Sequence, residues 1–587
     1  MRWLKQNRHR TLDSARVRRA VESAVIAVSL FFCSACSASI GLPVSSAVTQ
    51  LPVQQKQQKH VYTSPRGPKS GADPEDILVG FLAALPAGPQ NDGFTVAKKF
   101  LTTSASRNWD PDQNVLVFSS EPSFWRQAKV MEGVEESKTD KVSMTASFKI
   151  SGTVDNHGLY SAANRSLSKR LGYTFKKTEG QWRIDSLPQG IQIQDSVFDQ
   201  TFRQVCLYQV DSTLRTLIPD IRWFGWRQWR TSAVKEILSE PAGYLGKAAV
   251  RVATPEIMQT TESVPVVDNM VQVRLSSSVM KLSKKQRALL VHQIRMTLGE
   301  GDSSYELSIR DEDGNDISAD DSDLNLEVVV PRKSLYALNQ DVIFKLRYDS
   351  LTRMAQIRKE DATDVRGLVF SSAGGALQRS DSTVRCINAK GKDCGSLFDG
   401  QSVDFIASGY GRETWASTRT PHAQLLVQNS EGLQEIPLTW IGEKDQVVAL
   451  AVSPEGSRLL VAVREEGKTV LRMAGVERDV HGAVVSVSNA STIIAQASGI
   501  SSACFHDSLT VVYAIFNGQQ GARQVAPGPE YDQNVPEDTT MLAAGFIDDV
   551  QGTASLDTNG VVRSVTGPLS TPWLLLDAQV SAIASGE

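Results

Sequence analysis

The chain of 587 residues is too long to fold around one hydrophobic core, so its length predicts three or four domains. Charged residues make up 22% of the chain and hydrophobic residues 41%, which is typical of soluble globular proteins. The formal net charge of −3 at pH 7 argues against binding to nucleic acid and predicts no strong attraction to anionic lipid.

The N-terminal segment has the three parts of a bacterial lipoprotein signal. Seven basic residues lie between Arg2 and Arg19, an apolar stretch covers residues 24–33, and two small residues precede Cys36. The apolar stretch, of about ten residues, is too short for a helix that crosses the roughly 30 Å of hydrocarbon in a bilayer. We therefore predict a signal peptide over residues 1–35 and acylation of Cys36, which would hold the rest of the chain outside the cytoplasmic membrane.

Two alternatives fit the same segment. Cys33 stands where lipoprotein signals usually carry leucine, so an ordinary secretory signal or an N-terminal anchor would also produce this pattern. Cleavage before Cys36 would remove seven basic and two acidic residues. The remaining chain would carry 55 basic and 63 acidic residues, and hence a formal charge of −8.

A polar segment separates this signal from the first folded domain. Residues 36–72 are rich in Gln, Ser, Thr and Pro without hydrophobic periodicity, which predicts a tether. Asp73 and Pro74 suit the N-cap and the first position of a helix. The first domain is therefore expected over residues 73–200.

Helices followed by strands predict an α+β class for this domain. A second helix is expected over residues 95–101. Residues 142–150 alternate between apolar and polar side chains, which predicts a strand, and residues 173–184 read as a hairpin that turns at Gly180.

A second α+β domain is expected over residues 201–330. It begins with an apolar strand at residues 205–210 and continues with an alternating strand at residues 271–275. Ser283 and Gln286 have the spacing of a capping box, which predicts the start of a helix.

The C-terminal half has a different texture, because helical periodicity disappears and short apolar runs alternate with turn residues. Residues 446–473 form the clearest unit of strand, turn, strand, turn and strand, with weaker repeats at an irregular spacing of roughly 40–60 residues. We predict a β-propeller of about five or six four-stranded blades over residues 331–587, with a pair of β-sandwiches as the alternative. The predicted fold class is thus multidomain, with two α+β domains followed by an all-β propeller.

The cysteines outside the signal divide into two pairs. Cys386 and Cys394 flank a turn-like stretch, and in an oxidising compartment this spacing predicts a hairpin disulfide, with two free thiols as the alternative. Cys206 and Cys504 sit in apolar runs and are expected to be buried.

Catalytic and metal-binding motifs are incomplete in this sequence. Residues 467–469 resemble the end of a phosphate-binding loop, but Ala462 holds the place of its first glycine. Residues 166–169 and 232–235 match S-x-x-K, although the partner motifs of that enzyme class are absent. The histidines lack the spacing of metal ligands. We therefore predict no enzymatic activity, no metal and no cofactor.

An acidic stretch over residues 311–323 invites a calcium interpretation. With Gly314 at the sixth position of such a loop, Ile309 would occupy the first ligand position, which excludes the motif. We predict a hairpin turn with a solvated acidic face, or alternatively a contact for a basic partner.

Five aromatic residues of the C-terminal half either pack between blades or line a binding face. They are Tyr410, Trp415, Trp440, Phe505 and Trp573.

The order of these parts resembles the actinobacterial LpqB lipoprotein family. Residues 73–82 and 97–102 resemble its first domain, and residues 217–223 resemble its junction motif. Residues 269–276 resemble the domain that the family shares with GerM, and residues 449–458 resemble one of its propeller blades. The resemblance covers nearly the whole mature chain and depends on the order of the parts.

The resemblance implies a lipoprotein on the extracytoplasmic face of the cell membrane. Its implied partner is the extracytoplasmic domain of the sensor kinase MtrB, whose response regulator is MtrA, with effects on cell-wall homeostasis and division. Activation and inhibition of the kinase are equally compatible with the sequence. The alternatives are a cell-wall or glycan-binding module that uses Trp415 or Trp440, and an envelope hydrolase.

Overall fold

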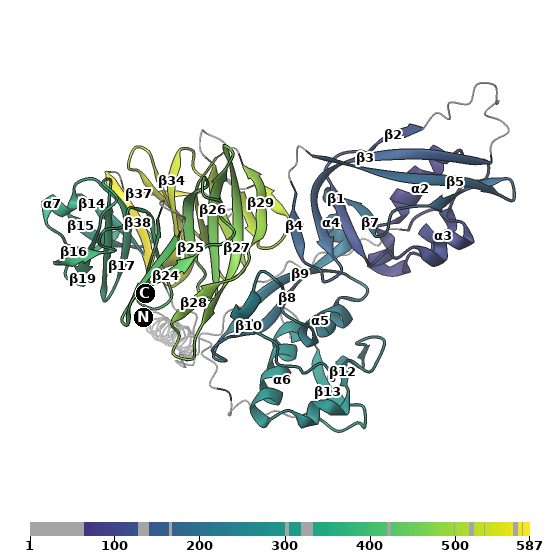
Figure 1. Ribbon diagram of the computed structural model, residues 1–587, viewed down its shortest axis with the longest axis horizontal. Coiled ribbons are helices and arrows are strands. Elements are labelled where there is room, and N and C mark those ends of the chain that lie inside the picture. The colour runs from purple at the N-terminus through teal and green to yellow at the C-terminus, as the bar shows by residue number, and fades with distance from the viewer. Residues whose placement is uncertain are drawn as a thin grey trace, which may run out of the picture. The chain divides into compact units, whose positions relative to one another are not determined.

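The computed structural model describes residues 64–126, 140–163, 167–299, 305–317, 324, 333–418, 424–497, 499–515, 522–532, 535–567, 573–577 and 579–587. The predicted signal peptide and most of the predicted tether lie outside these residues. The described chain is multidomain and mostly β, with its strands in several separate sheets (Figure 1). Within it, no helix is both long and apolar enough to span a bilayer.

The N-terminal part places short helices before and after a seven-stranded sheet. Its elements are α2 (Pro74–Ala84), the π-helix η2 (Gly88–Asp92), the 3-10 helix η3 (Ala97–Phe100), α3 (Thr103–Asn108), β1 (Asn114–Phe118), β2 (Ser123–Arg126), β3 (Lys141–Asp155), β4 (Tyr160–Ala162), β5 (Ser168–Thr178), β6 (Gln181–Ser186), β7 (Ile191–Gln194) and α4 (Asp195–Thr201). The sheet order is β6-β5-β3-β1-β7, with β2 and β4 also paired to β3. Only the β1–β7 pair is parallel among these described strands.

Two local predictions for this part are confirmed. The carboxylate of Asp73 accepts a hydrogen bond of 2.9 Å from the backbone N–H of Asp76, so Asp73 caps α2. Alternation along β3 buries Met144, Ala146 and Phe148 in the core that the helices share. The opposite side chains of β3 therefore face away from that core.

The helix predicted over residues 95–101 is wrong in its extent, because only the single turn η3 forms. The carboxylate of Asp92 accepts hydrogen bonds from the backbone N–H groups of Phe94 and Val96 and closes a tight turn before it. Leu101 is already extended, and the N–H of Thr102 donates to the carbonyl of Ile184 at 2.9 Å. Bonding to the sheet thus ends the helix after one turn.

The second part contains two small sheets and two helices. Its elements are β8 (Phe202–Asp211), β9 (Leu217–Gly225), α5 (Trp229–Leu238), the 3-10 helix η5 (Gly246–Ala248), β10 (Ala249–Val250), β11 (Val266–Val267), β12 (Met270–Leu275), the 3-10 helix η6 (Ser277–Lys281), α6 (Lys284–Gly299) and β13 (Glu306–Asp311). The sheet orders are β10-β8-β9 and β11-β12-β13. The predicted capping box is confirmed, since Ser283 and Gln286 exchange hydrogen bonds of 3.2 Å between side chain and backbone.

The acidic stretch after β13 forms a turn in its described portion. The N–H of Gly314 donates to the carbonyl of Asp311, and Gly314 has a φ of 87° that favours glycine. The carboxylate of Asp311 accepts from the backbone and side-chain N–H groups of Asn315. These bonds hold the chain reversal that was predicted here.

The described C-terminal part consists mainly of antiparallel strands, with one short helix. Its elements are β14 (Ser334–Asn339), β15 (Val342–Leu346), β16 (Leu351–Gln356), α7 (Lys359–Ala362), β17 (Val365–Ser371), β18 (Gly374–Arg379), β19 (Val384–Asn388), β20 (Asp393–Leu397), β21 (Val403–Ser408), β22 (Thr414–Thr418), β23 (Gln424–Asn429), β24 (Gly432–Pro437), β25 (Gln446–Val452), β26 (Arg458–Glu465), β27 (Lys468–Arg478), β28 (Val484–Val487), β29 (Ser491–Ala497), β30 (Ile500–Phe505), β31 (Thr510–Ile515), β32 (Ala522–Val525), β33 (Glu530–Asp532), β34 (Thr539–Ile547), β35 (Val550–Asp557), β36 (Val562–Thr566), β37 (Leu574–Asp577) and β38 (Val580–Gly586).

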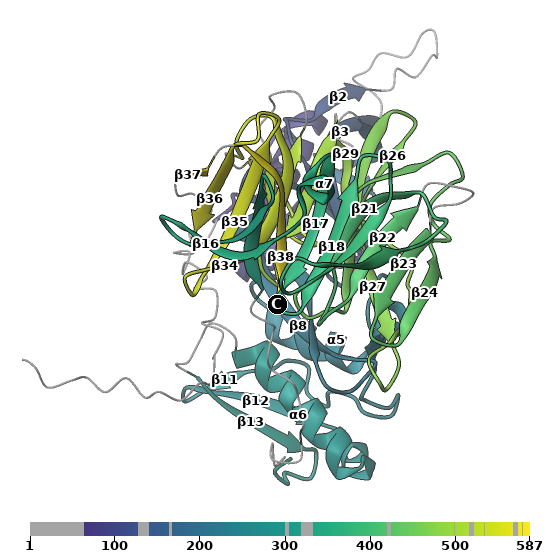
Figure 2. The same ribbon diagram turned by 90° about the vertical axis from the view of Figure 1, so that its left-hand side faces the viewer.

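These strands pair mainly with their neighbours in sequence. Four sheets comprise β17–β20, β21–β24, β25–β29 and β30–β33, and a larger sheet joins β34–β37 to β38-β14-β15-β16 through one parallel pairing of Ser334 with Phe546. The first strands β17, β21, β25, β30 and β34 each contact the next in this order, and β38 contacts both β17 and β34. Figure 2 shows β34, β38, β17 and β21 side by side.

Candidate functional site

Strand β9 carries an ion pair that is buried almost completely. Asp220 and Arg222 are separated by one residue, so both side chains leave the same face of the strand. The Arg222 guanidinium donates from Nε and Nη2 to Oδ2 of Asp220, at 3.0 and 2.8 Å. Their side chains are 2% and 0% exposed, so the pair is shielded from solvent.

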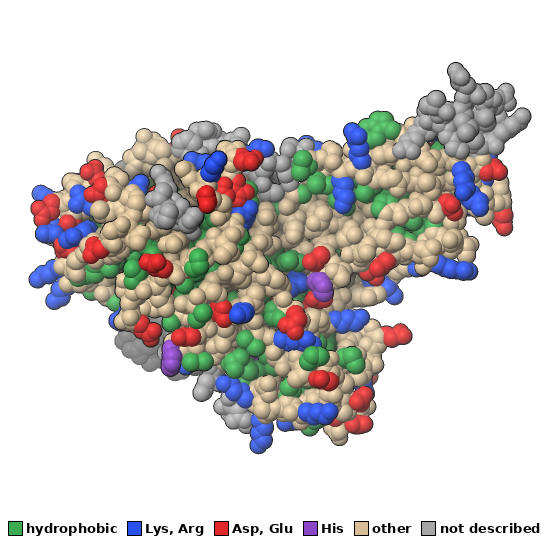
Figure 3. Space-filling view, in the orientation of Figure 1, with side chains coloured by type: hydrophobic (Ala, Val, Ile, Leu, Met, Phe, Trp, Pro, Cys, Tyr) green, Lys and Arg blue, Asp and Glu red, His purple; other side chains and the backbone are tan. Residues whose placement is uncertain are grey.

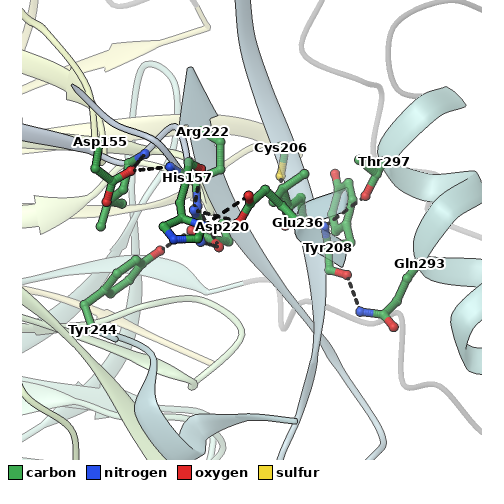
Figure 4. Close-up of polar contacts among 12 residues, drawn as sticks. Asp155, His157, Cys206, Tyr208, Asp220, Arg222, Glu236, Tyr244, Gln293 and Thr297 are labelled. Carbon is green, nitrogen blue, oxygen red and sulfur yellow. Dashed lines mark hydrogen bonds and ion pairs between the residues drawn. The ribbon is translucent and has the colours of Figure 1, made fainter. Parts of the chain in front are cut away.

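Three further side chains extend this pair into a network, which we call the β9 junction: Asp220, Arg222, Tyr244, Glu236 and His157 (Figure 4). The Tyr244 hydroxyl donates to Oδ1 of Asp220 at 2.9 Å. Oε2 of Glu236, on α5, lies 3.8 Å from Nη1 of Arg222. Both carboxylate oxygens of Glu236 lie 3.2 Å from Nδ1 of His157.

Burial and charge act in opposite directions on these groups. Burial alone would lower the pKa of Arg222, but the adjacent Asp220 carboxylate outweighs it and raises that pKa, so the guanidinium stays charged. Burial, reinforced by Asp220, raises the pKa of the Tyr244 phenol. Burial also raises the pKa of Glu236, although Arg222 and His157 oppose that shift.

The same strand is bonded to two segments that are distant in sequence. Nη1 of Arg222 donates to the carbonyl of His157 at 2.7 Å, and the backbone N–H of Trp223 donates to the carbonyl of Gly158 at 2.8 Å. On its other side, the indole N–H of Trp223 donates to the carbonyl of Pro527 at 3.0 Å. Strand β9 therefore joins the loop before β4 to the C-terminal sheets.

Two more contacts connect this region to β27. The N–H of Gly475 donates to the carbonyl of Tyr244 at 2.7 Å. The Ser212 hydroxyl donates to the carbonyl of Arg478 at 2.8 Å and accepts from its N–H at 3.0 Å. One apolar cluster also contains Ile218 together with Leu460 and other residues of the C-terminal sheets. These contacts bury Asp220, Arg222 and Tyr244 between the parts of the chain, while the side chain of His157 is 56% exposed.

On the opposite side, β8 is held by α6. The side-chain amide of Gln293 donates to the carbonyl of Tyr208 at 2.9 Å, and the backbone N–H of Tyr208 donates to the Thr297 hydroxyl at 3.1 Å. Gln293 and Thr297 are one helical turn apart, which places both on the same face of α6 (Figure 4). The network thus continues from β9 through β8 to this helix.

The chemistry of the β9 junction is that of a structural connection. Its charged groups are directed at one another, and among the described residues the ring of His157 is bonded to the carboxylate of Glu236 and not to a serine or a thiol. Across the described ranges, no cluster of His, Cys, Asp and Glu has the geometry to hold a metal ion. The arrangement bonds the loop at His157, helix α5 and the carbonyl of Pro527 to strand β9.

A pocket of about 710 Å³ lies beside α7 in the C-terminal part. Two of its guanidinium groups are bound by carboxylates: Nε of Arg358 lies 2.7 Å from Oδ2 of Asp361, and Arg385 pairs with Asp393. Arg379 also lines it. The pocket is therefore held together by internal ion pairs.

The residues predicted from the sequence lie apart from the β9 junction. Cys36 is outside the described residues. Cys386 on β19 and Cys394 on β20 form a disulfide, with their Cα atoms 5.1 Å apart, and Cys206 and Cys504 are buried as free thiols. The structure does not bring the cysteines together into one site.

The aromatic residues proposed for a binding face behave differently from one another. Trp415 is completely buried and its indole N–H donates to Glu413 at 2.9 Å, so it packs inside the sheets. Trp440 is half-buried, and its indole N–H donates to the carbonyl of Ser488 at 3.0 Å. Trp415 is therefore not available to a ligand at the surface.

Sequence reasoning did not assign a role to the members of the β9 junction. Charged residues at positions 220 and 222 within an otherwise apolar strand were the available signal, because buried charges require partners. Their partners could not be identified, since Glu236 lies on α5, Tyr244 in the segment after α5, and His157 between β3 and β4.

Comparison with known proteins gives consistent matches over the chain. Residues 67–199 match the family model described as Lipoprotein LpqB, N-terminal domain. A Lipoprotein LpqB from Bifidobacterium longum (strain NCC 2705) is 38% identical over 578 residues, covering 97% of this chain and 100% of the relative. A Lipoprotein LpqB from Mycobacterium bovis (strain BCG / Pasteur 1173P2) is 30% identical over 193 residues, covering 32% of this chain and 31% of that relative.

Similarity to solved structures is weak. Virginiamycin B lyase from Staphylococcus aureus covers 42% of this chain and 89% of its own, with 10% identity and a TM-score of 0.28. A functionally unknown protein from Desulfotomaculum acetoxidans DSM 771 covers 42% of this chain and 79% of its own, with 13% identity and a TM-score of 0.29. Similarity at this level supports no functional assignment.

Proposed function

Because the chain belongs to the lipoprotein LpqB family, we propose that it is a lipid-anchored extracytoplasmic protein that binds and modulates an MtrB-like sensor kinase. The observation that carries the proposal is the 38% identity to a complete Lipoprotein LpqB over 97% of this chain. The relatives carry the name of a lipoprotein rather than that of an enzyme, which favours a binding role.

Acylation of Cys36 supplies the anchor in this proposal. A chain attached to the membrane surface meets an integral kinase at a high effective concentration, so a weak interface is sufficient for binding. Modulation further requires that the protein binds one state of the kinase more tightly than the other. Tighter binding to the active state would activate the kinase, and tighter binding to the inactive state would inhibit it.

The finer part of the proposal is that the C-terminal sheets form a six-bladed β-propeller. Its support is the contact of each first strand with the next and the pairing of β38 with β14, which lets the end of this part complete a sheet that its beginning started. A crystal structure with six sheets around one axis would support this arrangement. Two face-to-face sandwiches would contradict it.

In this proposal, the β9 junction couples segments of the protein, so that they respond together when a partner binds. Its bonds join the loop at His157, the strand β9 and the carbonyl of Pro527. A partner that displaces one of these parts would therefore also displace the others, because hydrogen bonds connect them. The buried ion pair favours this role, because a charged pair removed from water tolerates little misalignment.

Crosslinking in intact cells tests the proposal directly. The full-length chain is crosslinked, purified and analysed by mass spectrometry beside two variants, Cys36→Ala and the matched control Cys33→Ala. We expect a sensor kinase ectodomain with the parent and with Cys33→Ala, and much less of it with Cys36→Ala. Recovery of wall polymer or wall enzymes without any kinase would instead favour a glycan-binding module.

The two alternatives lack a specific observation in their favour. Stacking of a sugar on Trp415 is excluded by the complete burial of that side chain. A hydrolase would need turnover by the purified chain on wall fragments, and such turnover would overturn the binding proposal.

A further inference from the structure

The outward face of the N-terminal sheet carries basic residues and an exposed tryptophan. On β2, β3, β5 and β6, the side chains that point away from the helices include those of Trp125, Lys141, Lys149, Arg170, Lys176 and Arg183, which define the basic sheet face. Over residues 141–149 of β3 and their partners on β2, β5 and β6, the other outward positions hold Ser, Thr, Gly and Gln, with no carboxylate. Asp155, an exposed carboxylate, lies at the far end of β3.

Strand register brings three of these cations into one row. Lys141 on β3 lies opposite Lys176 on β5, and Lys176 lies opposite Arg183 on β6. Side chains directly opposite each other in an antiparallel pair are separated by only about 5 Å at Cβ, and like charges at that distance destabilise the sheet. An anion on this face would remove the repulsion.

No carboxylate of the described chain neutralises this face. Among the described residues, none of the five cations forms an ion pair, whereas the nearby Arg126 pairs with Asp73 at 3.4 Å. Asp185 on β6 is directed to the other side, where it accepts from the hydroxyl of Thr102. The view in Figure 3 shows acidic and basic side chains interspersed elsewhere, as is usual for a soluble protein.

Trp125 adds an apolar element to the same face. Its side chain is 49% exposed, and the guanidinium of Arg170 lies 5.8 Å from its ring centroid. Thr145 on β3 is paired with Trp125 on one side and with Gly172 on the other. The space that a side chain at Gly172 would occupy is open. Tryptophan beside cations is typical of protein surfaces that contact the interface between lipid headgroups and acyl chains.

We propose that the basic sheet face docks on the anionic phospholipid headgroups of the membrane that carries the chain. Lysine and arginine side chains near an anionic leaflet are attracted to phosphate groups, and the attraction adds over neighbouring cations. The hydroxyl-bearing residues between the cations supply further hydrogen-bond donors to phosphate oxygens. The protein then lies against the bilayer through this sheet rather than only through its lipid.

The place where the segment from Cys36 joins the folded part favours the chain's own membrane as the ligand of this face. The N–H of Gly71 donates to the side-chain oxygen of Gln181 at 2.7 Å, so the segment that leads from Cys36 reaches the folded part beside β6. The 28 residue-to-residue steps from Cys36 to Ser64 can span at most about 100 Å. The argument from the tether rests on the proposed acylation, but the charge and register of the face do not.

Vesicle binding by the unacylated protein tests the contribution of the basic sheet face without that of the tether. The whole mature chain with Cys36→Ala is sedimented with vesicles of equal parts phosphatidylglycerol and phosphatidylcholine, and with vesicles of phosphatidylcholine alone. We expect binding only to the anionic vesicles and a steep loss of binding as salt is raised. Because the assay contains no kinase and no acyl chain, its failure would leave the proposed function untouched.

A charge-matched pair of variants makes the test specific to this face. Lys141→Gln/Lys176→Gln/Arg183→Gln removes the row, and Lys98→Gln/Lys99→Gln/Arg107→Gln removes three exposed cations on the helical side. We expect the first variant to lose about tenfold or more of its vesicle affinity and the second to lose less than about twofold. The first variant should also melt no lower than the parent, because a like-charge row has been removed.

Three outcomes would overturn the proposal. The first is equal binding to both kinds of vesicle, and the second is an equal loss of affinity in the two variants. The third is that Lys141→Gln/Lys176→Gln/Arg183→Gln loses binding to a soluble anionic wall polymer but still binds vesicles. The last outcome would assign the face to the polymer instead of to the bilayer.

Discussion

The hydroxyl of Tyr244 donates to one carboxylate oxygen of Asp220, while the guanidinium of Arg222 holds the other. The carboxylate is therefore satisfied from both sides at a position that is 0% exposed. Tyr244 is also bonded through its carbonyl to Gly475, so a buried charge on β9 is stabilised by a residue that is itself attached to β27. Tyr244 therefore stabilises the charge through its side chain and attaches the two parts through its backbone.

Arg222→Met should destabilise the protein strongly, because it leaves the Asp220 carboxylate buried without its cation. We expect a loss of about 3–5 kcal/mol, measured as a lower denaturation midpoint in urea. Arg126→Gln, which breaks the exposed pair with Asp73, should cost no more than about 1 kcal/mol. Adding Asp220→Leu to Arg222→Met should recover much of the loss, and no recovery would show that the charge was not its cause.

Glu236 should make stability fall as the pH rises. Burial raises its pKa in the folded chain above the ordinary value of 4.5, so the folded state binds this proton more tightly than the unfolded state. The resulting stabilisation is complete below pH 4.5 and is lost as the pH rises through the raised pKa. Thermal midpoints of the parent and of Glu236→Gln measured across this range should therefore move in favour of the variant with increasing pH. Parallel curves would exclude Glu236 as the titrating group.

Loss of the disulfide between Cys386 and Cys394 should be measurable without disturbing the β9 junction. In the chain-entropy description, opening a loop of this size costs roughly 2–3 kcal/mol. We expect Cys386→Ser/Cys394→Ser to lower the midpoint of the C-terminal part by a corresponding amount. Reduction of the parent should lower the midpoint by the same amount. As a control, the same reducing agent should leave the midpoint of the double variant unchanged.

The free thiols should be unreactive until the chain unfolds. Cys206 and Cys504 are both buried, and burial raises the pKa of Cys504 to about 12, so almost no thiolate is present at neutral pH. A thiol reagent should label neither residue in the native oxidised protein and both in denaturant. Native labelling of Cys504, located by peptide mass spectrometry, would contradict the burial of this thiol on β30.

Local signals explain which elements were predictable. The capping carboxylate of Asp73 and the reciprocal pair of Ser283 and Gln286 act within one turn of helix, so their effect could be read from neighbouring residues. The segment at residues 95–101 has the composition of a helix, but hydrogen bonding of Thr102 to Ile184 ends it after one turn. That competing partner is distant in sequence and could not be inferred from the local pattern.

The basic sheet face likewise combines a feature that the local sequence predicts with one that only the sheet register produces. A whole-chain charge of −3 predicts no strong attraction to anionic lipid, because a sum over the chain does not record where the charges lie. Alternation along β3 predicts that Lys141 and Lys149 face outward together. Only the register of β3 with β5 and β6 places Lys141, Lys176 and Arg183 in one row.

The sequence by itself determined the order of the parts, the periodicity of the first helix and strands, and the family resemblance that led to the proposed function. These properties depend on residues that are adjacent or a few positions apart, so the chain displays them without folding. Tertiary structure alone decided that Arg222 would meet Asp220, Glu236 and the carbonyl of His157, and that Trp223 would reach Pro527. Those contacts form only when segments separated by up to 304 residues are brought together, because burial of the apolar surface around them excludes water from the charged groups.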